Sequence, residues 1–228
     1  LPMLKIDEPT LIMNFCVTPS PMAGREGKYV PSRKIWDRLQ KELQSNVALR
    51  VKETDEDGIF EVAGRGELHL TILLENMRRE GYELAVSKPR VIFQTINGEK
   101  HEPIEMVTAD IEEAHQGGVM QALGERKGEL VNMEPDGRGR VRLEYRIPAR
   151  GLIGFSNEFL NLTRGSGLIA NIFDSYEPFK GEIRGRKNGV LISMDDGEIF
   201  TYALGKLDDR GRMFVKAGDP VYEGMIVG

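Results

Sequence analysis

The chain has 228 residues, of which 40% are hydrophobic and 29% are charged, a composition typical of folded globular proteins rather than disordered ones. Its 31 Lys and Arg residues and 36 Asp and Glu residues give a formal net charge of −5, which excludes a uniformly basic nucleic-acid binder but allows a local basic patch. Cys16 is the single cysteine, so an intramolecular disulfide is excluded, and we expect a reducing, cytoplasmic location.

Residues 10–96 have the pattern of a strand–helix–strand–strand–helix–strand unit. Alternating apolar residues predict strands at 10–18, 47–51, 59–63 and 91–96. Ser32 is the expected cap of the first helix, and Gly81 is the expected stop of the second. The first helix has its apolar stripe at Ile35, Leu39 and Leu43. The second helix is expected to bury Leu68, Ile72, Leu73 and Met77.

Residues 103–178 repeat this order. Strands are expected at 104–112, 130–133, 141–147 and 168–173, with a Pro-Asp-Gly turn at 135–137. The two predicted helices carry Val119, Ala122 and Leu123, and Phe155, Phe159 and Leu162. Two βαββαβ units in tandem predict an α+β fold with two ferredoxin-like sandwiches, at 1–98 and 99–180, each with helices on one face of an antiparallel sheet.

The last part of the chain, 181–228, has a different sequence pattern. Short apolar runs are separated by Gly and Asp turns, and no helical period is visible. We therefore expect a third, all-β domain. The chain begins without Met and stops at a strand-like Met-Ile-Val-Gly run, so we expect it to be a piece of a longer protein.

One strand of the second sandwich has a row of arginines. Arg138, Arg140, Arg142 and Arg146 occupy even positions, and apolar residues occupy the odd positions from 141 to 147. Since side chains alternate across a sheet, the arginines should line the face without helices, where guanidinium groups could bind phosphate. A solvated face, or one neutralised by acidic residues of a neighbouring domain, is an equally good interpretation.

A second basic group, Arg184, Arg186 and Lys187 around Gly185, opens the third region. It could follow an RNA backbone, or it could be an ordinary solvated turn.

The motifs of enzymes are missing from the sequence. Gly27-Lys28 is followed by Tyr29 instead of Ser or Thr, so it is not a P-loop. His69 is expected to be a packed histidine, and His115 with Glu112 lacks the second ligand pair of a zinc site. We assign no catalytic, cofactor or metal residue. No apolar run approaches the ~18 residues of a membrane span, so no membrane partner is expected.

Several strings resemble elongation factor G-like translational GTPases. Gly-Glu-Leu-His-Leu at 66–70 and Ser-Lys-Pro-Arg-Val at 87–91 resemble domain III of that family. The stretch 117–135, with its Met-Glu-Pro, and the glycine-containing strings at 149–155 and 163–167 resemble domain V. Two departures separate the chain from elongation factor G itself: only 97–102 joins the sandwiches, so domain IV is missing, and the tail after 180 has no counterpart.

The resemblance implies the RNA-binding arm of a bacterial translational GTPase. Such a protein would bind the ribosome between its subunits, contact rRNA, ribosomal proteins and A-site tRNA, and assist large-subunit assembly and translation in the cold or under stress. GTP and Mg²⁺ would bind a G domain preceding Leu1, and the protein would be a cytoplasmic monomer. The alternative is a regulatory module that binds a small ligand between tandem ferredoxin-like domains, because fold alone does not choose between these functions.

Overall fold

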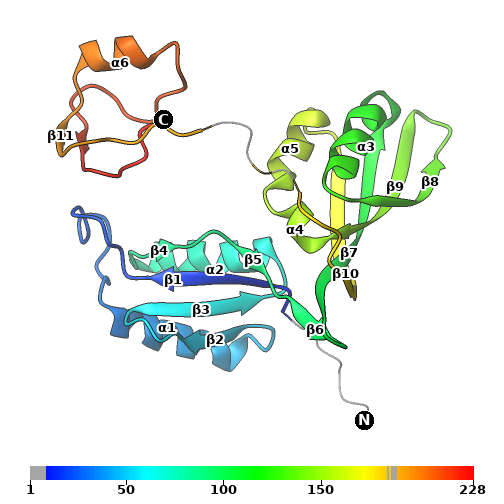
Figure 1. Cartoon of the computed structure of the whole chain (residues 1–228), viewed down its shortest axis with the longest axis horizontal. Helices are drawn as coiled ribbons and strands as arrows, with labels where there is room; N and C mark the ends of the chain where they lie inside the picture. Colours follow the sequence, from blue (N-terminus) through cyan, green and yellow to red (C-terminus); the bar gives the residue numbers. More distant parts are fainter. Residues whose placement is uncertain (1–8, 184, 186–188) are drawn as a thin grey trace. The chain divides into compact units, whose positions relative to one another are not determined.

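The chain contains two antiparallel sheets with equivalent strand orders, seen in a computed structural model that describes residues 9–183, 185 and 189–228. These residues divide into two compact units, within 1–184 and 185–228. The first unit holds both of these sheets with their helices, shown in blue to cyan and in green to yellow in Figure 1. The predicted pair of ferredoxin-like sandwiches is confirmed.

The first sandwich follows the predicted βαββαβ order. Its elements are β1 (Leu11–Cys16), α1 (Ser32–Ser45), β2 (Arg50–Glu53), β3 (Ile59–Gly64), α2 (Glu67–Glu80), β4 (Ala85–Val86) and β5 (Arg90–Val91). The sheet order is β2-β3-β1-β4, with β5 also paired to β1. Alternate residues of β1 (Leu11, Met13 and Phe15) pack in one core with Ile35 and Leu39 of α1, as the apolar stripes predicted.

The stripe predicted for α2 was partly wrong. Leu70, Leu73 and Met77 are its buried residues, whereas Leu68 is 73% and Ile72 is 51% exposed. Apolar residues lie on two sides of this helix, so the sequence pattern alone does not decide which side meets the sheet.

The start of α1 and the end of α2 both depend on backbone conformation. Ser32 is the first residue of α1 and not its cap; Pro31 holds that position, and its fixed φ of −61° suits the start of a helix. Gly81 ends α2 as predicted, in the left-handed region at φ 94°, where its N–H bonds back to the last turn.

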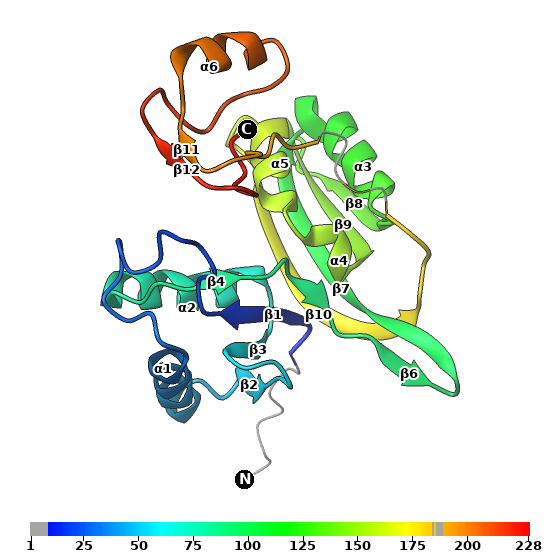
Figure 2. The same cartoon turned by 60° about the vertical axis from the view of Figure 1, so that its left-hand side comes forward.

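The predicted closing strand 91–96 is divided between the two sheets. β5 ends at Val91 and pairs with β1, whereas β6 (Gln94–Ile96) pairs with the first strand of the second sheet. Asn97 (φ 53°) and Gly98 (φ 84°) form a tight turn with both residues at positive φ, which matches the twist of a two-residue hairpin. The expected linker 97–102 is thus the tip and return strand of this hairpin, which Figure 2 shows projecting from the sheet.

The second sandwich repeats the order with longer strands. Its elements are β7 (Glu99–Glu112), a 3₁₀ turn (Glu113–His115), α3 (Gln116–Glu125), β8 (Glu129–Pro135), β9 (Arg140–Pro148), α4 (Ala149–Leu152), α5 (Phe155–Leu162) and β10 (Leu168–Pro178). The sheet order β10-β7-β9-β8 is equivalent to that of the first sheet. Val119 and Leu123 of α3 and Phe159 of α5 form its buried core with the odd-numbered residues of β9, as predicted.

The second unit is not all-β, which corrects the prediction for 181–228. It has a two-stranded sheet of β11 (Gly197–Glu198) and β12 (Pro220–Val221) and a seven-residue helix, α6 (Thr201–Leu207). A helix of two turns with Gly205 in it is too short to produce a recognisable apolar period. Val221 and Val227 are its buried apolar residues among those described.

Candidate nucleic-acid interface

The alternation predicted for β9 is present in the structure. Its odd-numbered residues Val141, Leu143, Tyr145 and Ile147 are buried under the helices. Arg140, Arg142 and Arg146 therefore lie on the opposite, open face of the sheet, where the cross-strand partners of Arg142 and Arg146 are Asp110 and Met106 of β7.

Arg138 does not belong to this row, contrary to the prediction. It lies in the turn before β9, where Asp136 Oδ1 accepts hydrogen bonds from the backbone N–H groups of Arg138 (2.7 Å) and Arg140 (3.0 Å). These bonds hold a turn through Arg138, so β9 begins two residues later than the arginine spacing suggested. The Arg138 side chain is exposed at the hairpin tip.

Arg142 and Arg140 converge on Asp110. The Arg142 guanidinium donates from Nη2 (2.8 Å) and Nε (3.2 Å) to Asp110 Oδ2, and this bond raises the pKa of Arg142 further. Arg140 reaches across β7 and donates to the backbone carbonyls of Asp110 (3.0 Å) and Ser166 (3.5 Å). Both arginines are therefore held by groups of neighbouring segments.

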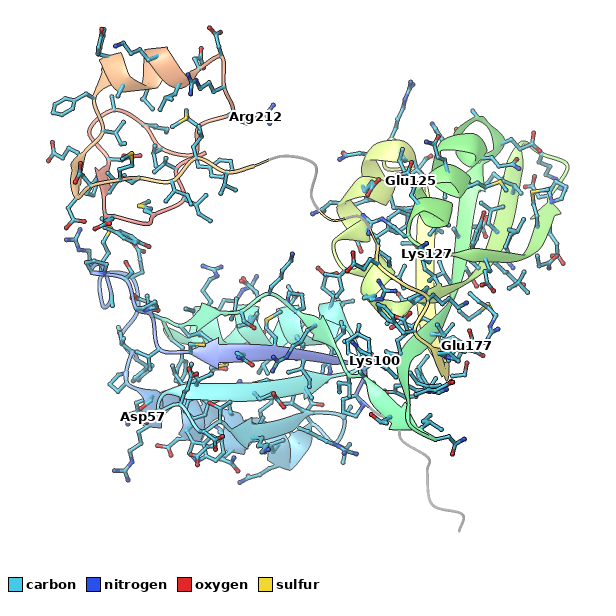
Figure 3. The ribbon with its side chains drawn as sticks, viewed as in Figure 1. Asp57, Lys100, Glu125, Lys127, Glu177 and Arg212 are labelled. Carbon is cyan, nitrogen blue, oxygen red and sulfur yellow. The ribbon has the colours of Figure 1, made fainter. Side chains whose placement is uncertain are left out.

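Arg146 is engaged by β10. It donates to Asp174 Oδ2 (2.8 Å), Ser175 Oγ (3.2 Å) and Glu177 Oε1 (2.6 Å); Glu177 is labelled in Figure 3. The hydrogen bond from Arg146 lowers the pKa of Asp174. Burial alone would raise the pKa of Glu177, but hydrogen bonds from Lys180 and Arg146 outweigh burial and leave this pKa lowered.

We call the open face of the second sheet around these side chains the arginine face. Its guanidinium groups belong to Arg140, Arg142 and Arg146. Its carboxylates belong to Asp110, Glu112, Glu129, Glu134, Glu144, Asp174 and Glu177. Lys180 adds a fourth cation, because its ammonium pairs with Glu129 (2.8 Å) and Glu177 (3.2 Å), so four cations and seven anions give a balance of −3. The acids come from the sheet's own strands, whereas one alternative in the sequence analysis placed them on a neighbouring domain, and phosphate binding by these arginines stays a prediction.

The second predicted basic group cannot be placed. Arg184, Arg186 and Lys187 lie outside the described residues.

The sequence analysis missed a basic surface on the first sheet, which we call the β2 face. Arg50 and Lys52 lie on edge strand β2 opposite Ala63 and Glu61, both with exposed side chains. Arg90 of β5 lies on the same face and pairs with Glu61 at 2.8 Å. Three cations and one anion give a balance of +2. The spacing of Arg50 and Lys52 was the available signal, and it is the same two-residue spacing that marked β9.

His69 is held by neighbouring side chains and backbone, as expected of a packed histidine. His69 Nε2 lies 2.9 Å from Asn46 Nδ2, and its Nδ1 accepts the N–H of Arg65 at 3.3 Å. Burial lowers the pKa of His69. Among the residues that the structure describes, no group of three or more His, Cys, Asp and Glu side chains is arranged to hold a metal ion. No helix within the described ranges is long and apolar enough to span a membrane.

Comparison with known families gives two adjacent matches. The elongation factor G C-terminus family matches residues 99–187, and the TypA/BipA C-terminal domain matches residues 188–228. The two sandwiches and the first match define a class, the C-terminal region of elongation factor G-like proteins. The second match and the similarities described next are narrower: over its whole length, this chain is similar to one part of TypA/BipA proteins.

Three relatives illustrate the similarity. Proteins named large ribosomal subunit assembly factor BipA from Salmonella typhimurium and Escherichia coli are each 60% identical over 229 aligned residues. The protein of that name from Bacillus subtilis is 56% identical over the same length. All of this chain is covered in these alignments, but it spans only 37–38% of the length of the relatives. Among solved structures, the alignment with one from Thermus thermophilus covers 78% of this chain and 42% of the Thermus chain, at 14% identity and a TM-score of 0.49.

Proposed function

We propose that this chain is the ribosome-binding arm of a translational GTPase that assists assembly of the large ribosomal subunit. The observation that carries the proposal is the 56–60% identity over the entire chain to relatives named for that role. The chain supplies binding surfaces and no chemistry of its own.

The proposed RNA contacts are phosphate contacts. They are Arg50 and Lys52 on the β2 face, Arg138, Arg140, Arg142 and Arg146 around the arginine face, and Arg184, Arg186 and Lys187. Arginine and lysine side chains on strands bind backbone phosphates without reading bases, so they position a protein on RNA and carry little sequence information. The proposed partners are large-subunit rRNA, A-site tRNA and ribosomal proteins.

The chemistry of the proposed parent protein belongs to a G domain outside this chain. GTP and Mg²⁺ would bind there, hydrolysis would occur there, and the parent would act as a cytoplasmic monomer. A calorimetric titration of this chain with a non-hydrolysable GTP analogue should give no heat of binding. Micromolar binding would contradict the proposal that GTP binds outside this chain.

Co-sedimentation with purified large subunits tests the proposal directly. The 228-residue chain should pellet with large subunits at low salt and release progressively as salt rises, because phosphate contacts release counterions. Purified small subunits serve as the control and should retain less of the chain. Failure to pellet with large subunits at any salt concentration would overturn the proposal for the isolated chain.

A further inference from the structure

A cavity of about 860 Å³ lies within the first unit, where the two sandwiches meet. The contact beside it is specific: Ala149 and Ile153 pack against the core of the first sandwich, and the Gly154 N–H donates to Glu67 Oε2 at 3.2 Å. Cavities of a few hundred to a thousand cubic ångströms, apolar with a few fixed polar groups, are typical of small-molecule sites.

One wall of the cavity is made of exposed apolar side chains of the first sandwich. Val47 is 76%, Leu68 is 73% and Ile72 is 51% exposed, and all three line the cavity. Large apolar side chains grouped at a hollow are an unusual use of surface and mark a binding site. This wall also explains why α2 is apolar on two sides: its buried residues face the sheet, while Leu68 and Ile72 face the cavity.

The opposite wall contains a buried carboxylate without a cation. Glu105 of β7 is 4% exposed, and its Oε2 accepts a hydrogen bond from the Asn171 amide. Its Oε1 has no partner among the described residues, and burial raises the pKa of this carboxyl. Glu105 lines the cavity, and its Oε1 is not among the fully buried unpaired atoms of the described residues, so this oxygen is open to the cavity and can accept a charge-assisted hydrogen bond from a cationic ligand.

The other charged groups that line the cavity already have roles. Glu42 is bonded to Arg38 at 2.8 Å, and Glu67 accepts the Gly154 N–H. His69 is held by Asn46, and Arg65 is an exposed lining residue. Glu105 is therefore the group in this cavity that is both buried and available.

We propose that this cavity binds a small organic cation with an apolar body. The ammonium group donates to Glu105 Oε1, and the apolar body lies against Leu68, Ile72 and Ile153. The charge-assisted bond fixes the orientation of the ligand, and the apolar contacts remove the exposed wall from water. Such a site makes the junction of the sandwiches responsive to a metabolite, in addition to the binding of RNA at their open sheet faces.

Three probes of similar shape test the chemistry of the site: 2-phenylethylamine, 2-phenylethanol and 3-phenylpropionate. Each is titrated into the ¹⁵N-labelled 228-residue chain, and backbone amide shifts are followed by NMR. The amine should shift the signals of Ile72, Gly154 and Asn171, with an affinity at least tenfold above those of the alcohol and the carboxylate. Equal affinities for the three probes, or no shifts at these residues up to the solubility of the amine, would overturn the proposal.

Two variants locate the site, each with a matched control. Glu105→Gln keeps the shape and removes the charge, and should weaken binding of the amine at least tenfold; Glu125→Gln, at the exposed end of α3 (Figure 3), should leave binding unchanged. Ile72→Lys places a cation in the apolar wall and should abolish binding, whereas Leu160→Lys, at a 47% exposed position that does not line the cavity, should not.

If substitution of the buried Glu105 unfolds the chain, Ile72→Lys still tests the site, because Ile72 is half-exposed. Unchanged affinity in Ile72→Lys would contradict the site. Ribosome binding is scored separately by co-sedimentation, so its failure leaves this test intact.

Discussion

The two sandwiches of the first unit have the same strand order and opposite charge on their open sheet faces. The β2 face combines three basic side chains with Glu61 alone, whereas the arginine face combines four basic side chains with seven carboxylates. The numbers of basic residues are therefore similar, and the acids on neighbouring strands make the difference in net charge. A basic strand should attract phosphate more weakly where the strands beside it are acidic.

The largest effects on stability should come from substitutions in the hydrophobic cores, since each sandwich has a core of its own. Phe159→Ala should lower the free energy of unfolding of the second sandwich by about 3–5 kcal/mol, and Leu39→Ala that of the first by about 2–5 kcal/mol, because both side chains are fully buried. Ile72→Ala, at a half-exposed position, should cost less than about 1 kcal/mol. Urea unfolding followed by circular dichroism measures all three. An equal loss in Ile72→Ala and Leu39→Ala would show that α2 is packed by its other side.

A buried ion pair distinguishes the second sandwich from the first. Glu102 is fully buried and accepts hydrogen bonds from the Arg150 guanidinium and from the Lys180 N–H at 2.8 Å. Glu102→Ala leaves Arg150 without its counter-charge, so it should cost about 3 kcal/mol in the same urea experiment. The pair of Lys180 with Glu129, whose side chain is 63% exposed, is the control, and Glu129→Ala should cost at most about 1 kcal/mol. Similar costs for the two substitutions would mean that Arg150 finds water or another acceptor.

The sequence predicted the side-chain pattern within single elements well, and the contacts between distant elements poorly. The apolar period of α1 and the alternation of β9 follow from side-chain geometry within one element, and both were correct. The partners of Arg142 and Arg146 lie on β7 and β10, 28 to 32 residues away, and no pattern within β9 reveals them. The same limit applies to Leu68, whose surroundings depend on the other sandwich, and to Gln94–Ile96, which joined the second sheet through the Asn97-Gly98 turn.

The salt dependence of RNA affinity tests the difference in charge between the β2 face and the arginine face. Removing one phosphate contact should flatten the log–log dependence of RNA affinity on salt by about 0.7–0.9, so Arg50→Ala with Lys52→Ala should flatten it by about 1.5. Arg140→Ala with Arg142→Ala should flatten it less, since both arginines are already engaged by groups of β7 and release fewer counterions. Affinities for a large-subunit rRNA fragment at several salt concentrations give both slopes. Equal slopes would show that the arginines exchange carboxylate for phosphate freely.

The smallest effects on stability should come from two loops. In each loop, a carboxylate accepts hydrogen bonds from backbone N–H groups. In the first sandwich, Glu83 accepts the N–H groups of Gly24 (3.0 Å) and Gly27 (2.9 Å); in the second, Asp136 accepts those of Arg138 and Arg140. These bonds lower the pKa of both carboxyl groups, from ordinary values near 4.5 and 3.8. The stabilisation is therefore complete above the ordinary pKa and is lost as the pH falls through the lowered one.

The two carboxylates differ in the length of chain that each one closes. Asp136 bonds residues two and four positions away, so Asp136→Asn should loosen only the hairpin tip. Glu83 connects residues 56 to 59 positions apart, and Gly27 approaches so closely that a Cβ there would lie 2.9 Å from the Glu83 backbone nitrogen. Glu83→Gln removes the negative charge that these amides share, so Gly24 and Gly27 should exchange with solvent faster and no longer titrate with acid. Hydrogen exchange and amide shifts, followed as the pH is lowered from about 6 through and below the ordinary pKa, measure both effects. A Gly27 amide that titrates at the ordinary glutamate value near 4.5 would show that this loop is held by its own turns and not by Glu83.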